Sequence, residues 1–180
     1  SDFATTLVIF VSRQSDAGWV SASFTVGDGG AAIWDDAEQE VRVMCRPDSG
    51  EFAGQTRFLS TSEFENAADL KARLFVDVRS RFTAAFALTD GITDPKFPTD
   101  AVFADPEAWA DFWRKDFGQV DLASDTLETD LLDWMGFWSR GNHDDRTLAA
   151  MVLEPGSAAP VQEDTAAGES TETPQYAVED

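Results

Sequence analysis

The single histidine of the chain is the first residue to weigh for chemistry, because the imidazole is the side chain that most readily moves protons near neutral pH. It is His143, within the segment GNHDDR at 141–146. Asp145 could orient His143 as a general base, or Asp144 could join it as a metal ligand. A zinc site would need a second His or a Cys pair, and the sequence contains neither. We therefore interpret His143 as a loop residue that follows a helix, and we expect no metal or cofactor.

Carboxylates are the most abundant groups that could do chemistry. Four of them crowd one predicted helix, at Asp125, Glu128, Asp130 and Asp133. They lack the loop spacing and central glycine of an EF-hand calcium site, so we interpret them as a solvated helix face. With 34 acidic residues, however, some pair will always lie at a distance suited to hydrolysis. A hydrolase that uses carboxylates and His143 therefore stays open as an alternative.

Other catalytic and phosphate-binding signatures are absent from the sequence. There is no G-x-S-x-G, no G-x-x-x-x-G-K-[ST] and no H-E-x-x-H. Residues 27–30 (GDGG) have the composition of a phosphate loop, but they join two apparent strands, and we predict a hairpin turn there. Six arginines gather between residues 42 and 81, and we expect them to pair with the surplus acids. They are Arg42, Arg46, Arg57, Arg73, Arg79 and Arg81. We assign no catalytic residue.

The charge of the chain narrows the possible partners and the source. There are 34 acidic and 13 basic residues, a net charge of −21, and the only lysines are Lys71, Lys96 and Lys115. Acid excess with few lysines is typical of proteins from organisms that accumulate salt. Nucleic acid and anionic membranes are held by basic residues, so neither is an expected partner. No apolar run approaches the roughly 20 residues of a membrane span, and we expect a cytoplasmic location, or a virion if the protein is viral.

Cys45 is the only cysteine, so no disulfide can form within the chain. It follows the alternating residues Val41 to Met44, a pattern typical of a half-buried strand. We expect Cys45 to be chemically inert.

The pattern of apolar residues predicts an α+β fold. Residues 5–60 favour an antiparallel sheet of four to five strands, with turns at 14–18, 27–30 and 47–50. Ser62 and Glu65 resemble a capping box, and apolar residues then recur every four positions, which predicts one long helix over about 62–90. Asp105, Pro106 and Glu107 predict a helix start. A smaller, aromatic-rich helical pair is expected over about 105–140.

The composition changes after residue 153. Residues 154–180 carry seven acids, no base and one aromatic, Tyr176, and are rich in Pro, Ala, Ser and Thr. Such a stretch buries too little apolar surface to offset the entropy of ordering it. We expect a single folded domain over 1–153 and a tail over 154–180 that is disordered unless it docks on a partner.

The aromatic residues suggest the function we favour from the sequence. Eight Phe and Trp lie between Phe103 and Trp138. A packed core explains their helical spacing, but Trp is also favoured at protein interfaces. The residues that we expect to bind a partner are Trp109, Trp113, Trp134, Trp138 and Tyr176. The sequence therefore predicts a non-enzymatic structural or interaction subunit of a homo- or hetero-oligomer in a halophile, such as a haloarchaeal virus particle component. The alternatives are a small-molecule or peptide-binding module and the hydrolase above.

Overall fold

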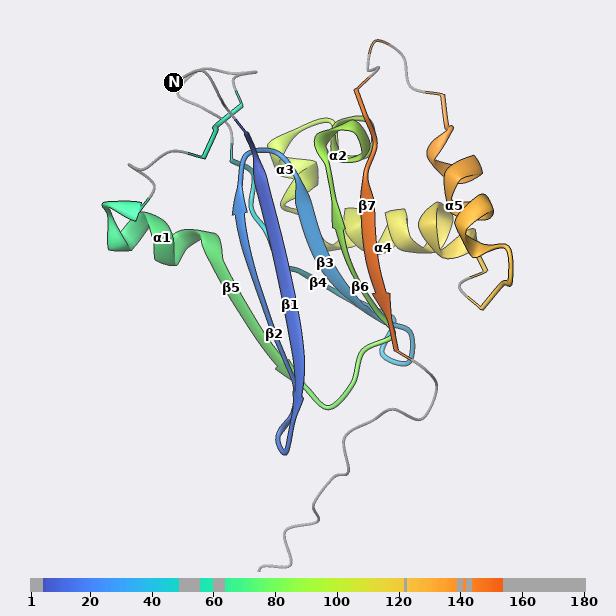
Figure 1. Cartoon of the computed structure of the whole chain (residues 1–180), viewed down its shortest axis with the longest axis horizontal. Helices are drawn as coiled ribbons and strands as arrows, with labels where there is room; N and C mark the ends of the chain where they lie inside the picture. The colour runs from blue at the N-terminus through green and yellow to red at the C-terminus, as the bar shows by residue number, and fades with distance from the viewer. Residues whose placement is uncertain are drawn as a thin grey trace, which may run out of the picture.

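Seven strands form two antiparallel sheets in this computed structural model, which describes residues 5–48, 56–59, 64–121, 123–138, 141 and 144–153. The first sheet has the order β1-β2-β5, built from β1 (Leu7–Ser15), β2 (Gly18–Val26) and β5 (Leu74–Arg79). The second has the order β4-β3-β6-β7, built from β4 (Glu40–Val43), β3 (Gly30–Asp35), β6 (Ala84–Leu88) and β7 (Leu148–Val152). Figure 1 shows the two sheets face to face. The α+β class with antiparallel pairing is therefore confirmed. The single sheet of four to five strands expected over 5–60 is wrong, because β5, β6 and β7 lie after residue 60 and the seven strands divide between two sheets.

The two sheets pack through a small apolar core. From the second sheet, Ala31, Ile33 and Ala85 point toward the first, and Met44 and Phe82 close its sides. Alternation along β3 decides this, because odd and even positions face opposite sides of a strand. Ala32 and Trp34 consequently face the other way, into the helical layer. The strand β3 is buried on both faces, which explains its unbroken apolar run.

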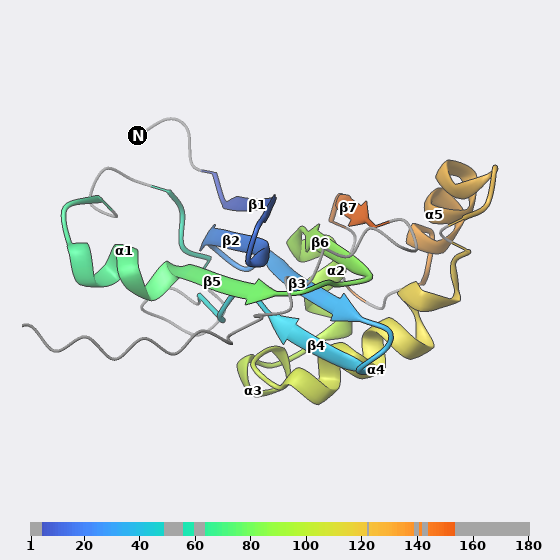
Figure 2. The same ribbon diagram turned by 90° about the horizontal axis from the view of Figure 1, so that it is seen from below.

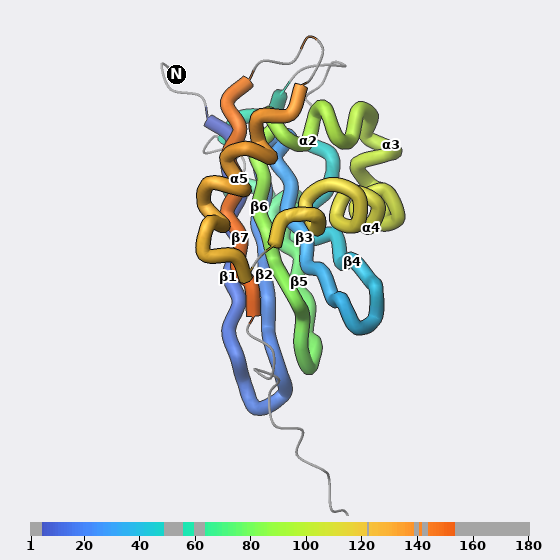
Figure 3. Tube along the Cα trace, turned by 90° about the vertical axis from the view of Figure 1, so that its right-hand side faces the viewer, coloured from blue at the N-terminus to red at the C-terminus, as the bar shows by residue number. Residues whose placement is uncertain are grey.

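Helices cover the other face of the second sheet, as Figures 2 and 3 show. They are α2 (Asp90–Lys96), α3 (Asp100–Phe103), α4 (Pro106–Lys115), the short 3-10 helix η2 (Phe117–Gln119) and α5 (Leu127–Met135). The start of α4 is confirmed, since the Asp105 carboxylate accepts a hydrogen bond from the Glu107 backbone at 3.0 Å. The aromatic-rich helical pair expected over 105–140 corresponds to α4 and α5.

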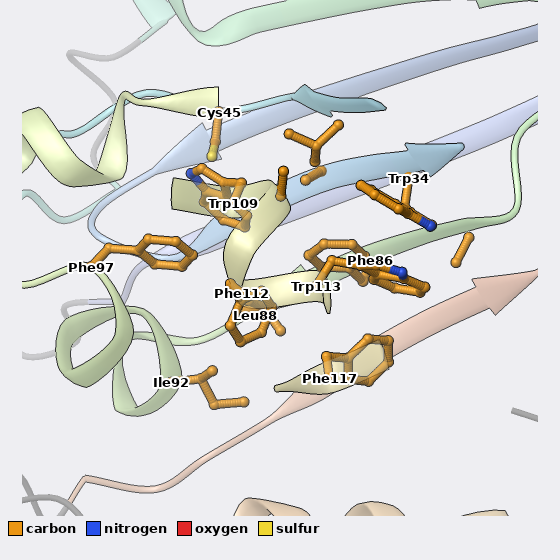
Figure 4. Packing of buried hydrophobic residues seen from close by; sticks show 14 of the residues in the cluster. Trp34, Cys45, Phe86, Leu88, Ile92, Phe97, Trp109, Phe112, Trp113 and Phe117 are labelled. Atoms are coloured by element: carbon orange, nitrogen blue, oxygen red, sulfur yellow. The ribbon is translucent and has the colours of Figure 1, made fainter. Parts of the chain in front are cut away.

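Aromatic rings fill the space between this helical layer and the sheet (Figure 4). Trp109 stacks on Phe97 at 4.2 Å between ring centroids, and Trp113 stacks on Trp34 at 5.5 Å. The Trp109 ring also lies against the Cα of Gly30, where a Cβ would overlap it. Because Trp109 is fully buried, truncation to alanine should cost about 3–5 kcal/mol of folding free energy.

The long helix predicted over about 62–90 is wrong. The segment contains α1 (Ala67–Arg73), then β5 and β6. A spacing of four is also a multiple of two, so Leu74 and Val78 share a face of a strand as readily as a face of a helix. The β-branched residues of β5 and pairing with β2 decide for the strand. The cap of α1 is Asn66, whose side chain accepts from Ala68, whereas Ser62 lies outside the described residues.

The outer face of the first sheet is apolar and exposed. Its outward positions run in rows across the three strands, such as Val11, Ala22 and Val76. Val11 is 56% exposed and Val76 54% exposed. The inward positions Ser21 and Ser23 are polar and buried. The alternation in β2 therefore points its apolar side outward. The domain boundary at residue 153 stays a prediction, because 154–180 lie outside the described residues.

Candidate active site

Strand pairing brings four aspartates together at one end of the second sheet. Asp28 precedes β3, Asp90 and Asp94 follow β6 in α2, and Asp144 precedes β7. In the ladder, Gly30 of β3 pairs with Leu88 of β6, which in turn pairs with the first residue of β7. The segments that extend beyond these paired ends must therefore lie side by side. Residues more than 100 positions apart in the sequence meet at one site.

Gly91 permits a close approach between two segments of this site. A Cβ at position 91 would collide with the carbonyl oxygen of Asp145, and would lie 3.0 Å from that of Asp144. Thr89 fastens the same two segments, since its hydroxyl accepts a hydrogen bond from the Thr147 backbone at 2.9 Å. Glycine at 91 thus lets the segment before β7 pack directly on the start of α2.

Asp28 is held from two sides. The Thr93 hydroxyl, on the buried side of α2, donates to the Asp28 carbonyl oxygen at 2.8 Å. The Thr56 hydroxyl donates to Oδ2 of the Asp28 carboxylate at 2.7 Å. Its Oδ1 is buried and has no hydrogen-bond partner among the described residues. A buried carboxylate oxygen without a partner is costly, and a cation would satisfy it.

Partial desolvation and mutual repulsion raise the pKa of two of these carboxylates, of which Asp90 is half-buried and Asp94 keeps an exposed side. The pKa of Asp94 is raised first by desolvation and then by the charges of Asp28, Asp90 and Asp144. The pKa of Asp90 is raised by desolvation, against the Gly91 N–H that lowers it, and further by Asp28 and Asp144. Carboxylates arranged so that they disfavour one another's charge are typical of functional sites.

A cleft of about 460 Å³ opens beside the cluster. Asp28 and Asp94 contribute to its wall, and Phe97, Phe103 and Pro98 form an apolar side. A small charged group could reach the carboxylates here while an apolar group rests on the aromatic rings.

The cluster has the chemistry of a site for hard divalent cations. Mg²⁺ prefers oxygen ligands, keeps several waters, and is held in proteins by one or two carboxylates together with substrate phosphates. In the described part of the chain, no three Asp, Glu, His or Cys side chains converge closely enough to enclose one ion. The arrangement therefore fits cations that are each held by one or two carboxylates and water. The unpartnered Oδ1 of Asp28 is the observation that favours it.

Comparison with known families identifies the family of this chain. Residues 1–136, out of 180, match the family described as protein phosphatase 2C. The chain belongs to the protein phosphatase 2C family. No curated protein and no solved structure matches it.

Membership in a phosphatase family corrects the function predicted from the sequence. The non-enzymatic structural subunit and virus particle component are wrong, and the prediction that the protein is not an enzyme is wrong with them. The findings favour the hydrolase alternative. Of the residues named for it, Asp144 lies in the cluster, whereas His143 lies outside the described residues.

The residues expected to bind a partner are dispersed in this phosphatase-family chain. Trp109 and Trp113 are buried in the core and have little surface left for a partner. Trp134 is half-buried against Phe117, and Trp138 is 82% exposed. Tyr176 lies outside the described residues. Their role in binding stays a prediction.

The other assignments from the sequence fare differently. Cys45 lies beyond the end of β4 and is buried, not half-buried in a strand as expected. Burial raises the pKa of its thiol to about 12, which favours the prediction of an inert cysteine. Four of the six arginines pair with acids as expected, namely Arg42, Arg73, Arg79 and Arg81. Residues 27–30 do join two strands, but these belong to different sheets, so the predicted hairpin is wrong. The carboxylates of α5 are not among the charges that raise the pKa of Asp90 and Asp94, and Asp133 is exposed on that helix.

One signal in the sequence could have located the site. Asp28-Gly29 and Asp90-Gly91 each follow an apolar strand, and Asp144-Asp145 precede another apolar run. Taken one at a time, Asp28 lies in a predicted turn, Asp90 at a predicted helix end and Asp144 beside His143. Only their common position at strand ends would have indicated one site.

No helix among the described residues has the length and apolarity to cross a membrane.

Proposed function

We propose that this chain hydrolyses phosphate monoesters, with phosphorylated protein side chains as the substrate class and divalent cations held by Asp28, Asp90, Asp94 and Asp144. Two findings support the proposal together: the match to the protein phosphatase 2C family and the four carboxylates gathered beside a cleft. The observation that carries it is geometric: aspartates from three separate segments meet at one end of the second sheet, and Oδ1 of Asp28 is buried there without a partner among the described residues.

The charge of the cluster explains why cations are required. A phosphate monoester is a dianion near neutral pH, and four carboxylates would repel it. When bound, Mg²⁺ or Mn²⁺ would supply the positive charge that attracts the phosphoryl group and activates a water for attack. The bound cations would thus let the substrate's phosphate enter a site whose carboxylates would otherwise repel it.

In this mechanism, other side chains of the protein hold the aspartates in position and line the cleft. Thr56 fixes the Asp28 carboxylate by its hydrogen bond to Oδ2, and the buried Oδ1 is then the oxygen that would hold a cation. Thr93 ties the Asp28 backbone to α2 and so keeps Asp90 and Asp94 beside it. On the apolar side of the cleft, the exposed Pro98 would contact the protein chain around the phosphorylated residue, and the buried rings of Phe97 and Phe103 support that wall from beneath.

Hydrolysis of 4-nitrophenyl phosphate by the full chain tests the proposal. The assay runs in molar KCl, to screen the net charge of −21, with and without Mn²⁺ and EDTA. We expect cation-dependent release of 4-nitrophenol that EDTA abolishes, and a loss of roughly 100-fold or more in Asp90→Asn. The matched control is Asp133→Asn, an exposed acid of α5 outside the cluster, which should keep full activity. A folded protein that releases no product with Mg²⁺ or Mn²⁺, from this ester or a phosphopeptide, would contradict the proposal.

A further inference from the structure

A buried ion pair lies beside the candidate active site, and its Asp48 is part of the wall of the same cleft. Arg73, the last residue of α1, is 0% exposed, and Asp48 is 6% exposed. The pair is two-pronged: Nη2 of Arg73 donates to Oδ1 of Asp48 at 3.0 Å, and Nη1 donates to Oδ2. Such fork geometry fixes the relative orientation of both groups.

The ion pair also forms hydrogen bonds with the backbone just before Asp28. Nη1 of Arg73 donates to the carbonyl oxygen of Thr25 at 3.2 Å. Oδ2 of Asp48 accepts from the backbone N–H of Gly27 at 2.9 Å. Gly27 has φ +96°, a conformation that side chains disfavour, so the chain turns sharply at the residue before Asp28. The hydrogen bonds to Thr25 and from Gly27 thus set the direction of the turn that carries Asp28.

Stability alone does not account for such a pair. Burying two charges costs desolvation that their attraction often fails to recover, and apolar replacements are frequently as stable. The Asp48–Arg73 pair does something that apolar side chains could not do, since it accepts from Gly27 and donates to Thr25 at the same time. Its value lies in the geometry of the turn.

We propose that Asp48 and Arg73 are positioning residues that hold Asp28 in place to bind a divalent cation. The inference rests on the proposed function, in which Asp28 is a cation ligand. Neither residue touches the cation or the substrate phosphate in this scheme. They act through the Gly27 turn, as outer-shell groups act on the ligands of other metal sites.

The test compares cation binding by wild type and by the double variant Asp48→Leu/Arg73→Leu. Mn²⁺ is titrated into the full chain by calorimetry, and the melting temperature is measured with and without Mn²⁺. We expect the double variant to fold but to bind Mn²⁺ about 10- to 100-fold more weakly. The rise in melting temperature on adding Mn²⁺ should shrink in the same variant.

Two further variants keep the test decisive. Arg73→Lys keeps the charge but loses the fork, and should weaken Mn²⁺ binding to an intermediate degree even if the double variant fails to fold. The control is Asp77→Asn/Arg79→Gln, an ion pair of β5 at the opposite end of β2, which should leave Mn²⁺ affinity unchanged. Hydrolysis supplies a second readout: excess Mn²⁺ should restore turnover in the Arg73→Lys variant.

The outcomes separate this inference from the proposed function. Wild-type Mn²⁺ affinity in the folded double variant, or in Arg73→Lys, overturns the positioning role alone. Turnover that excess Mn²⁺ does not restore also overturns it, because the residues would then act on something other than cation binding. A wild-type chain that binds neither Mn²⁺ nor Mg²⁺ overturns the proposed function, and the positioning role with it.

Discussion

At the scale of single residues, Asp94 places function and stability in opposition. Its raised pKa means that the folded state, without cations, disfavours its charge relative to the unfolded chain. An acid whose pKa is raised on folding lowers stability as pH rises from its unfolded pKa through its folded pKa, and the full penalty remains above that window. At neutral pH the cation-free protein therefore bears this cost, which bound cations would remove.

The Asp94→Asn variant separates the two effects. Without cations at pH 7 its melting temperature should exceed that of wild type, and the difference should disappear as pH falls below the unfolded pKa of Asp94. Its Mn²⁺-dependent hydrolysis should fall roughly 100-fold, because a charged ligand is lost. Calorimetric melting across pH with EDTA, together with the ester assay, checks both parts. A variant less stable than wild type at pH 7 would show that Asp94 is not repelled by its neighbours.

Cys45 offers a simpler test of the core. With a pKa near 12 against an ordinary value of 9.0, its thiolate at pH 8 should be roughly a thousandfold scarcer than that of a free thiol. Burial beneath the helical layer adds a steric barrier. We expect no measurable reaction with a disulfide reagent in the native protein, and rapid reaction after denaturation. Fast labelling of the native thiol would show that the region around β4 opens readily.

At the scale of elements, the contact between α2 and the segment before β7 assembles the site. In Gly91→Ala, the new Cβ would collide with the carbonyl of Asp145 and push the segment that carries Asp144 away from Asp90. We expect a stability loss of about 1–3 kcal/mol from this overpacking. Hydrolysis should fall more than tenfold, because the separated carboxylates hold cations less well. The matched control is Gly141→Ala, where no atom lies within 4 Å, although its φ of +79° adds backbone strain. If the control loses as much activity, the effect at position 91 is not one of contact.

The same elements show how far the sequence predicts this molecule. Local signals such as the Asp105 cap and the turn residues around Gly18 predict α4 and the β1–β2 hairpin, because the determining contacts lie within a few residues. The segment after Ser62 was mispredicted because spacing by four suits both a helix and a strand, and only pairing with β2 decides. The site was missed for a related reason. Asp28 and Asp144 are neighbours solely through the ladders of β3, β6 and β7, which no local pattern reveals.

At the scale of the whole molecule, the acidic charge and the exposed apolar surface lie on different parts of the protein. The chain carries a net charge of −21, yet the outward positions of the first sheet hold no acid. Ile9, Val11, Leu74, Val76 and Val78 are each between 45% and 56% exposed there. Two strands, β1 and β5, also lie at the edges of that sheet. Exposed apolar faces and edge strands favour association between protein chains.

The behaviour of this outer face can be measured directly. Val76→Lys places a charge in the middle row, beside Ala22. Because Val76 is already half exposed, the change should alter folding free energy by less than about 1 kcal/mol, as surface substitutions usually do. It should lower both the fluorescence of a bound apolar dye and the fraction of associated chains at high protein concentration. Leu132→Lys, at an exposed leucine of α5, controls for loss of any apolar side chain and should change neither. If Val76→Lys instead destabilises the protein by several kcal/mol, Val76 is covered in solution. The first sheet would then be packed on its outer face as well as on its inner face.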